Sequence, residues 1–346
     1  MRSGELHLKF IQRTVSTPHK FQTRFPSQNL ILFQPRFVQR NVANCLQIEK
    51  GTMVMKIGID IGGSHIGIAL LDKEGKIIKK QEIDMLPELK NPKILVEYLD
   101  KNIEELTKEN NVELVGIACP GNPKGKKAMN LVNLGIDVLD FTPLAEKYKI
   151  PFLVKNDSKA AGLAEMNYGA MRGCKDAIFL CIGTGIGSAV FLNGRLLTAN
   201  KNLGFELGHI IIQKDGLQCN CGKRGCFETY CSIKRFKEKI REILSLGDIN
   251  SEQLLEKLKE NIKNPEIENV INEYIENLIV GLSNLIDIFE PEAICLGGSF
   301  VFFKDIFYDK LVTRMNTKKY VFNKDSLPKI VLAELKNDAG MIGSAI

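Results

Sequence analysis

The feature that most constrains the fold is a glycine-rich turn between two apolar strands, which occurs twice in the chain. The first turn lies in residues 60–66 (DIGGSHI), and the second in residues 182–189 (IGTGIGSA). Apolar runs interrupted by glycine in this way are typical of β-hairpins. Because the pattern occurs once in each half, it indicates a duplicated architecture with one hairpin per lobe.

The rest of the chain alternates strands with helices, which is typical of an α/β protein. With 346 residues, the chain is long enough for two domains with sizeable cores. Apolar residues fall on one face of a helix over residues 92–109. We expect strands at 57–61, 66–71, 76–83, 114–119, 152–154, 177–182, 189–192 and 293–296, and helices at 158–168, within 232–290 and at 337–346.

Both turns are candidate phosphate-binding loops, because glycine lets backbone N–H groups approach an anion closely. The candidate residues are Asp60, Gly62, Gly63, Ser64, Gly183, Thr184, Gly185 and Gly187. Either turn alone is explained equally well as a tight β-turn. A dinucleotide fingerprint is excluded for GTGIGS, because this motif leads into a strand instead of a helix. The chain also has no Walker sequence, G-x-x-x-x-G-K-[ST].

One histidine and three cysteines lie within 18 residues of each other. They are His209, Cys219, Cys221 and Cys226. Thiolates and an imidazole suit zinc, and structural zinc sites use four such ligands. The alternative is a group of core or surface thiols. Nearby Cys231 is interpreted as an ordinary helix cysteine, although it could replace one of the four ligands.

Asp157 is the candidate general base for a phosphoryl transfer, because it stands where a strand gives way to a helix. The neighbouring Asn156 could bond a sugar hydroxyl. The competing interpretation is that this Asn-Asp pair is a helix N-cap. Glu206 and Glu228 flank the cysteine-rich loop and are suited to accept hydrogen bonds from a polyol. The competing interpretation is that both glutamates are solvated surface residues, as is usual for this residue type.

The basic charge of the chain is confined to residues 1–54. This segment holds eight Lys/Arg and two Asp/Glu; the whole chain holds 47 and 41, so 39 of each remain after it. The main body therefore lacks the basic field expected of a nucleic-acid-binding protein. No run of about 18 apolar residues indicates a membrane helix. The odd number of cysteines argues against a disulfide framework and favours a reducing cytoplasm. Cys119, Cys181 and Cys295 are expected in the core.

Residues 1–54 have no clear periodicity and end where MKIGIDIGG begins. Three interpretations compete. The segment is a misassigned start or disordered tail, an organelle transit peptide, or a DNA-binding head. We favour the first, because the segment lacks two amphipathic helices joined by a short turn.

Taken together, these motifs resemble the ROK family (repressors, open reading frames and kinases), and within it the bacterial glucokinase type. The resemblance covers residues 55–346 and rests on DIGGS, Asn156-Asp157, GTGIGS, ELGH with CxCGxxGCxE, Gly297-Gly298 and the closing DAGMIGSA. Gly297 and Gly298 resemble the adenosine motif of the family. The chain departs from the usual pattern at His65, which we interpret as an incidental turn residue, and at Phe205, where glycine is common.

The resemblance implies a two-lobed α/β fold of the actin, hexokinase and Hsp70 type, with ribonuclease H-like lobes and a cleft between them. We expect residues 55–165 and 335–346 to form the small N-terminal lobe. Residues 166–334 are expected to form the large C-terminal lobe with the zinc loop.

The resemblance also implies ATP-dependent phosphorylation of a hexose at its 6-hydroxyl, most simply of D-glucose. Asp157 would be the base, and the sugar ligands would be Asn156, Asp157, Glu206, His209 and Glu228. ATP, Mg²⁺ and a structural Zn²⁺ would be bound, with Asp60 near the Mg²⁺, and the chain would form a homodimer or homotetramer. The alternatives are a ROK kinase for N-acetylmannosamine, N-acetylglucosamine, allose or fructose, and a sugar-responsive ROK repressor.

Overall fold

The computed structural model describes residues 53–199, 204–317 and 327–346. The segment 1–54, on which three interpretations compete, therefore lies almost wholly outside the described residues. Within the described ranges, none of the helices is long and apolar enough to cross a membrane.

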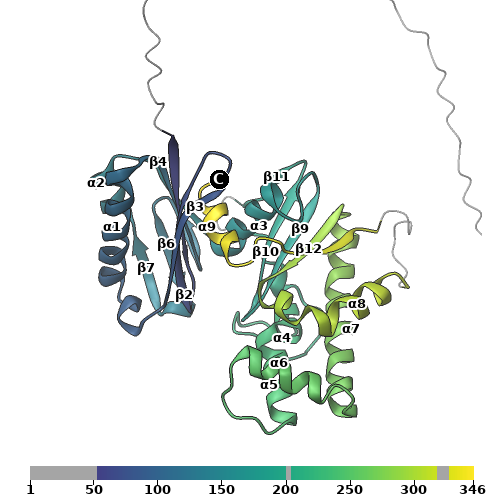
Figure 1. Cartoon of the computed structure of the whole chain (residues 1–346). Coiled ribbons are helices and arrows are strands. Elements are labelled where there is room, and N and C mark those ends of the chain that lie inside the picture. The colour runs from purple at the N-terminus through teal and green to yellow at the C-terminus, as the bar shows by residue number, and fades with distance from the viewer. Residues whose placement is uncertain (1–52, 200–203, 318–326) are drawn as a thin grey trace, which may run out of the picture. The chain divides into compact units, whose positions relative to one another are not determined.

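The first half of the described chain forms a five-stranded mixed sheet (Figure 1). Its strands, in spatial order, are β3 (Ile77–Asp84), β2 (His65–Leu71), β1 (Val54–Ile61), β4 (Asn111–Cys119) and β8 (Phe152–Asn156). Helix α1 (Pro92–Glu109) packs on one face through Leu95, Leu99 and Ile103. A small antiparallel sheet and three short helices complete this half: η1 (Pro87–Lys90), β5 (Asn122–Lys124), β6 (Lys127–Leu131), η2 (Val132–Leu134), β7 (Ile136–Asp140) and α2 (Thr142–Tyr148).

The second half forms another five-stranded sheet with its own helical layer. The spatial order is β11 (Arg195–Leu196), β10 (Ile186–Leu192), β9 (Ala177–Ile182), β12 (Ala293–Gly297) and β13 (Lys329–Leu332). The helices of this half are η3 (Leu207–His209), α4 (Phe227–Cys231), α5 (Ile233–Ile243), α6 (Ser251–Glu260), α7 (Pro265–Phe289), η4 (Gly298–Phe303) and α8 (Lys304–Met315).

The two sheets share one topology, which confirms the predicted duplication. In each, the first strand pairs antiparallel with the second and parallel with the fourth, and the fourth pairs parallel with the fifth. One expectation is wrong. The second strand of the second hairpin begins at Ile186 and not at Ala189, so Gly187 and Ser188 belong to β10. They are paired in the ladder with β9.

Side chains alternate between the two faces of a strand. Each hairpin therefore has one face that packs in the main core of its own half and an opposite face that points toward the centre of the molecule. In β1, Ile57, Ile59 and Ile61 pack in the core that contains α1, whereas Gly58 and Asp60 lie on the opposite face. The first strand of the second hairpin repeats this arrangement. Cys181 of β9 therefore occupies the position that corresponds to Asp60.

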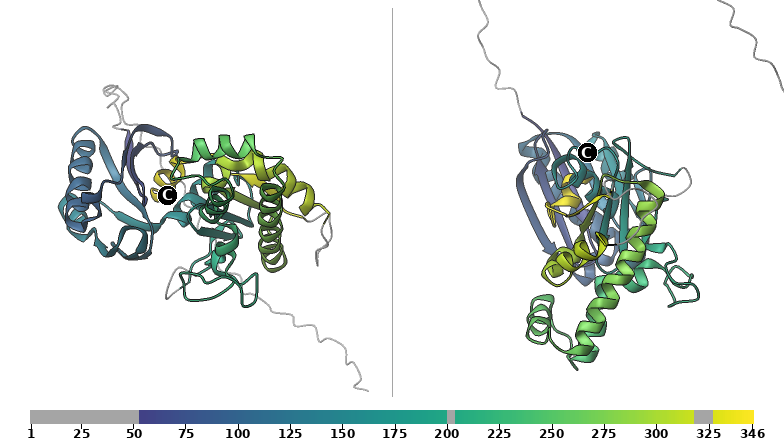
Figure 2. Two further views of the ribbon diagram at one scale, coloured as in Figure 1. Left: turned by 90° about the horizontal axis from the view of Figure 1, so that it is seen from below. Right: turned by 90° about the vertical axis from the view of Figure 1, so that its right-hand side faces the viewer.

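Two helices, α3 (Asp157–Tyr168) and α9 (Asp338–Ser344), lie side by side between the two sheets (Figures 1 and 2). Glycine residues let these helices approach each other and the neighbouring strands closely, because glycine has no Cβ atom. A Cβ atom added at Gly58 would lie 2.1 Å from the carbonyl oxygen of Met341 in α9. One added at Gly343 would lie 1.7 Å from the carbonyl oxygen of Ala160 in α3, and one at Gly162 would lie 2.4 Å from Ala189 Cβ in β10.

The chain crosses from one half to the other in two segments, and one buried carboxylate accepts hydrogen bonds from both of them. Glu165 of α3 is fully buried. Its Oε2 accepts a hydrogen bond from the backbone N–H of Ala170, just after α3, and its Oε1 accepts one from Leu335, just before α9. The expected boundary between the lobes at residues 165–166 falls inside α3, which contacts both α9 and the strands β9 and β10. That boundary stays a prediction.

We predict that Gly343→Ala lowers the thermal unfolding midpoint by several degrees. The new methyl group would meet backbone atoms of Ala160, and overpacking of this kind costs about 1–3 kcal/mol. In a protein of this size each kcal/mol corresponds to about 2–4 °C. Gly247→Ala is the matched control, because a Cβ atom there meets nothing within 4 Å. Equal midpoints for the two variants in scanning calorimetry would contradict the close packing of α3 and α9.

Candidate functional site

Asp157 is the first residue of α3, but it does not carry the capping role that its position allows. The side chain of Asn156 caps the helix by accepting a hydrogen bond from the Lys159 N–H at 3.3 Å, and its amide donates to the Gly121 carbonyl oxygen. Asp157 instead accepts from the N–H of Ser158 at 2.7 Å through Oδ1. The capping interpretation therefore applies to Asn156, and the Asp157 carboxylate needs another explanation.

Asp60 and Asp157 lie near each other although they come from different elements. Asp60 stands on the α9 face of β1, where Gly340 leaves room for its carboxylate. Burial, together with the carboxylates of Asp157 and Glu82, raises the pKa of Asp60 to about 7. Burial also raises the pKa of Asp157, although hydrogen bonds from Ser158 and the charge of Lys159 oppose this change. Two such carboxylates favour either a shared proton or a bound cation.

The thiol of Cys181 faces the same two carboxylates. Burial, and then the charges of Asp157 and Asp60, raise the pKa of Cys181 to about 12. Cys119 and Cys295 are fully buried, as expected for core residues. The side chain of Cys181 is partly accessible and lies at the edge of the core. Strand parity turns it away from Ile178, Leu180 and Ile182 and onto the other face of β9, where it packs against the core cluster that contains Phe179 and Cys295.

The first glycine turn leaves two of its predicted residues exposed. The N–H of Gly62 bonds to the carbonyl oxygen of His65 at 2.9 Å and closes the turn. Gly63 and Ser64 are exposed, and the Ser64 hydroxyl lies 3.3 Å from His65 Nδ1. The N–H groups and the hydroxyl of this turn are thus available to an anion. His65, which we interpreted as an incidental turn residue, follows the turn as the first residue of β2.

The second glycine turn is tied to the helices that follow it. It consists of Gly183, Thr184 and Gly185, with Thr184 exposed. Glu228 of α4 accepts a hydrogen bond from the Ile186 N–H at 2.9 Å, and Gly185 lets this carboxylate approach. Gly187 lies outside the turn, where it provides space for the Ser158 hydroxyl. Its glycine identity therefore has a packing reason.

The Gly297-Gly298 pair lies beside the second glycine turn. Gly297 ends β12 and is paired with Cys181 of β9. Gly298 has a φ of 67°, which favours glycine, and it lies against the Ile182 carbonyl oxygen. Two motifs that are more than 100 residues apart in sequence are thus adjacent at the carboxyl ends of neighbouring parallel strands, a common location for ligand sites in α/β proteins.

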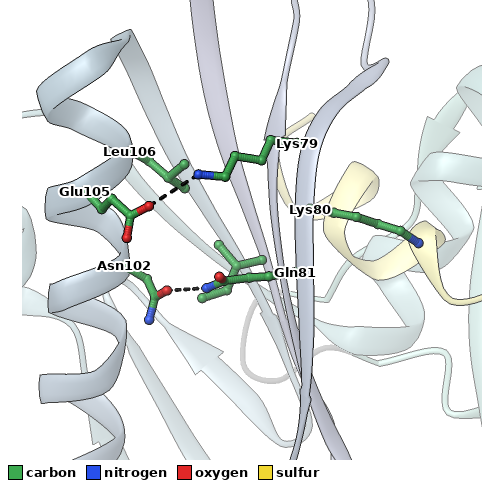
Figure 3. A pocket seen from close by; sticks show the side chains of 7 residues that line it. Lys79, Lys80, Gln81, Asn102, Glu105 and Leu106 are labelled. Carbon is green, nitrogen blue, oxygen red and sulfur yellow. Dashed lines mark hydrogen bonds and ion pairs between the residues drawn. The ribbon is translucent and has the colours of Figure 1, made fainter.

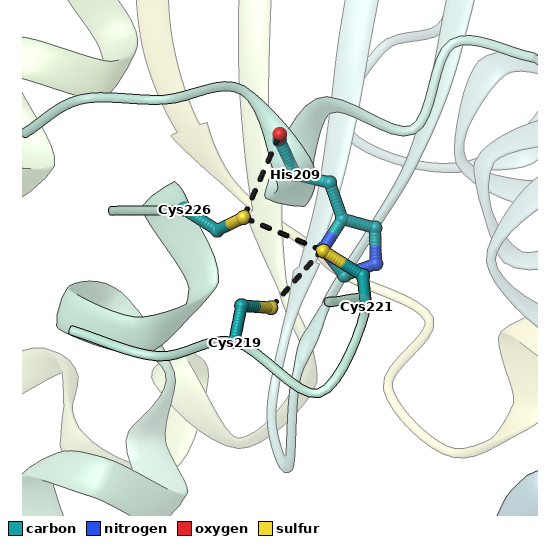
Figure 4. Close-up of side chains that lie close together, drawn as sticks. All are labelled: His209, Cys219, Cys221 and Cys226. Atoms are coloured by element: carbon teal, nitrogen blue, oxygen red, sulfur yellow. Dashed lines mark hydrogen bonds between the residues drawn. The ribbon is translucent and has the colours of Figure 1, made fainter. Parts of the chain in front are cut away.

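The predicted metal ligands converge in one cluster (Figure 4). The donor atoms of His209, Cys219, Cys221 and Cys226 all lie within 4.8 Å of one another. Cys221 Sγ and Cys226 Sγ are 3.6 Å apart, and Cys219 Sγ is 3.7 Å from His209 Nδ1. A tetrahedron with ligand bonds of about 2.3 Å has edges of about 3.8 Å. The donor set and its spacing therefore fit zinc. Cys231 is outside the cluster and fully buried in α4, which confirms that it is an ordinary helix cysteine.

The loop around the cluster is held by backbone hydrogen bonds. The Cys219 N–H bonds to the Lys223 carbonyl oxygen, and the Gly222 N–H bonds to that of Cys219. Lys223 Nζ donates to the His209 carbonyl oxygen at 2.7 Å. Gly222 and Gly225 both have positive φ, so these tight turns require glycine. The loop brings η3, which contains His209, to the start of α4, which carries Glu228.

Glu206 is held by a lysine that we did not identify from the sequence. Lys159 of α3 is only 3% exposed, and its Nζ lies 3.7 Å from the Glu206 carboxylate. The Ser188 hydroxyl donates to the Phe205 carbonyl oxygen at 2.6 Å, just before Glu206. The one available signal was a lysine inside the small-residue run DSKAAGLAE, where an exposed position was the natural expectation.

A separate pocket lies between β3 and α1 and contains none of the predicted site residues (Figure 3). Lys79 pairs with Glu105 across it at 3.2 Å, and Gln81 bonds to Asn102. Lys80 points to the opposite face of the strand, where it pairs with Asp338 of α9 at 2.8 Å. The side chains of this pocket are already paired with one another.

The sequence model of the ROK family matches residues 56–346. The chain belongs to the ROK family. Glucokinase of Streptomyces coelicolor is 27% identical over 313 residues, covering 85% of this chain and 97% of that protein. The xylose repressor of Caldicellulosiruptor bescii is 25% identical over 317 residues, covering 86% of this chain and 78% of that protein.

Solved ROK structures have the same fold. The ROK family glucokinase from Streptomyces griseus, solved in complex with glucose and AMPPNP, matches with a TM-score of 0.69. The match covers 84% of this chain and 98% of that one, at 24% sequence identity. The predicted two-lobed fold of the actin type is thereby confirmed for this ROK protein.

We predict that the purified protein contains one zinc ion per chain and that Cys226→Ser abolishes this stoichiometry. Cys226 is buried at the centre of the donor set, so its loss leaves three ligands for a tetrahedral ion. Elemental analysis after dialysis measures the metal content. Cys174→Ser is the control, since Cys174 is distant in sequence from the cluster and is not one of its members. Absence of zinc from the unmodified protein, or its retention in Cys226→Ser, would contradict the assignment.

Proposed function

We propose that this ROK protein is an ATP-dependent hexose kinase that phosphorylates D-glucose at the 6-hydroxyl. The observation that carries the proposal is the position of Asp157. Asn156 caps the helix and so leaves the Asp157 carboxylate free, and this carboxylate lies near the partly buried Asp60. Asp157 is also the first residue of α3, which packs on the second hairpin. The glucokinase of S. coelicolor and the S. griseus structure with glucose and AMPPNP support this choice of substrates.

Asp157 is proposed to accept the proton of the attacking sugar hydroxyl. Phosphoryl transfer proceeds through a loose transition state, so the protein acts chiefly by positioning and by electrostatic stabilisation. The hydrogen bonds from Ser158 and the charge of Lys159 oppose the rise in the pKa of this carboxylate that burial causes. The N–H groups of Gly63, Ser64 and Thr184 are the proposed contacts of the ATP phosphates, because the N–H of Gly183 donates to the Gly185 carbonyl oxygen at 2.9 Å and closes the second turn.

Asp60 is the proposed residue for Mg²⁺. Its carboxylate is partly buried near that of Asp157, and a divalent cation would compensate two negative charges that otherwise favour protonation. When bound, Mg²⁺ neutralises charge on the phosphates. Gly297 and Gly298 are proposed to contact the adenosine, next to the second turn.

The cysteine cluster is proposed to hold zinc in a structural role. His209 directs Nδ1 toward Cys219, which leaves Nε2 for a sugar hydroxyl. Glu206 lies three residues before His209, and Glu228 two residues after Cys226. A metal joined to His209 and Cys226 would thus set the separation of these two carboxylates, which with Asn156 we propose as the remaining sugar ligands.

The rival proposal is a sugar-responsive repressor, because the xylose repressor of C. bescii is similar over much of the chain. We favour the kinase, since a repressor needs sugar recognition but has no requirement for a general base. A second sugar remains the alternative within the kinases: N-acetylmannosamine, N-acetylglucosamine, allose or fructose.

We predict that Asp157→Asn lowers kcat for sugar phosphorylation by at least about a thousandfold, because a positioned base contributes about 10²–10⁴-fold and the substrate contact is lost as well. Asparagine retains an oxygen for the Ser158 N–H, so the fold should persist. A coupled assay of ADP release measures turnover. The exposed Asp137→Asn is the control. Near-normal turnover of Asp157→Asn would rule out this residue as the base.

We predict that D-glucose gives the highest kcat/KM in a panel of the five sugars named above, assayed with ATP and with polyphosphate. Isothermal titration calorimetry of the same sugars separates binding from turnover. Higher kcat/KM for another sugar would change the substrate assignment and leave the kinase chemistry intact. Tight sugar binding without phosphoryl transfer from either donor would favour the repressor class.

A further inference from the structure

Lys159 is a buried cation whose acidic neighbours, Glu206 and Asp157, both belong to the proposed site. It lies two residues after Asp157 in α3 and is 3% exposed. Its Nζ donates to the Ser188 carbonyl oxygen at 2.6 Å, and lies 3.4 Å from the carbonyl oxygens of Gly204 and Phe205. Its acidic partner is Glu206, at 3.7 Å.

The burial of this ammonium needs compensation, because removing a charge from water is costly unless the charge is paired. Burial lowers the pKa of Lys159, while Glu206 and then Asp157 act in the opposite direction. The two carboxylates that compensate the lysine are the proposed base and a proposed sugar ligand. Lys159 therefore joins these two groups through one side chain.

The backbone around Glu206 is fastened on both sides. Phe205 has a φ of 52°, a conformation that is unfavourable for a residue with a Cβ atom. Its carbonyl oxygen accepts from both Lys159 Nζ and the Ser188 hydroxyl. On the other side, the Leu207 N–H donates to the same hydroxyl at 3.2 Å. Glu206 thus projects from a segment that α3 and β10 hold in place.

We propose that Lys159 is a positioning residue for sugar recognition, which holds the Gly204–Leu207 segment and the Glu206 carboxylate against the helix that carries Asp157. The inference rests on the proposed kinase function. Lys159 is not proposed to touch the substrate. It acts through Glu206 and through the carbonyl groups that precede it, with Ser188 as its partner on β10.

The test is a double-mutant cycle of Lys159→Met and Glu206→Gln, with KM measured separately for glucose and for ATP. Methionine has a similar length but no charge and no donor. We expect Lys159→Met to raise the glucose KM by at least about tenfold, the size expected when a charge-assisted contact is lost, and the ATP KM by less than about twofold. Because Lys159 acts through Glu206, the double variant should lose little more than the worse single variant.

The matched control is Lys155→Met. Lys155 is also a partly buried lysine at the same strand–helix junction, and its Nζ donates to a backbone carbonyl oxygen, that of Ser344 in α9, at 2.6 Å. A general effect of removing a buried lysine would lower the thermal midpoint in both variants. Only Lys159→Met should change the glucose KM more than the ATP KM. Zinc content is measured in parallel to show that the cluster is intact.

A second variant keeps the inference testable if Lys159→Met does not fold. Ser188→Ala removes the other anchor of Phe205 and Leu207 but retains the ammonium, and it should also raise the glucose KM selectively. Glucose affinity from calorimetry replaces KM where turnover is too low, and it is the necessary probe because the chain has no tryptophan.

Three results would overturn the inference. They are additive loss in the Lys159→Met and Glu206→Gln cycle, an equal change of the glucose and ATP KM values, and an unchanged glucose KM in Lys159→Met. These are distinguishable from failure of the proposed function. If the unmodified protein phosphorylates no sugar, the kinase proposal fails. If it does and Lys159→Met leaves the glucose KM unchanged, only the positioning role fails.

Discussion

The close packing of α9 on α3 is the constraint on which the rest of the structure depends. Glycines at positions 58 and 343 allow backbone to contact backbone on the two sides of α9, and such contacts leave no room for gradual adjustment. Asp60 belongs to a strand that packs on α9, and Asp157 belongs to α3. The two carboxylates are therefore placed relative to each other by helix packing. The same side chains on a looser scaffold would not share a common environment.

Much of the fold could be predicted because its signals are local. Helix α1 has the bounds 92–109 that its apolar periodicity indicated, and both hairpins occur where apolar runs meet glycine. The four metal ligands were identifiable for a similar reason. Soft donors within 18 residues can converge only by folding back on themselves, so their spacing alone specified a cluster.

The features that could not be predicted depend on partners distant in sequence. Gly187 looked like part of a turn, yet it is paired with Cys181 in the strand ladder, and it is glycine because the Ser158 hydroxyl occupies the space a Cβ atom would need. Cys181 looked like an ordinary core residue, but it lies at the edge of the core, where the charges of Asp157 and Asp60 reach its thiol. Lys159 looked like a solvated helix residue until the Gly204–Leu207 segment was found to cover it. In each case the local sequence is ambiguous and a tertiary contact decides.

The segment from Gly204 to His209 contains only one short helix, η3, so side-chain partners must define its geometry. Lys159 and Ser188 hold its first half, and the cysteine cluster holds His209 at its end. These restraints come from opposite directions and differ in chemistry. A charge-assisted contact on one side depends on a buried ammonium, whereas the other side depends on three cysteines, one histidine and the metal that we propose they bind. Loss of either would free one end of the segment while the other end stays attached. Since Glu206 lies between the two ends, its position requires both restraints, and neither substitutes for the other.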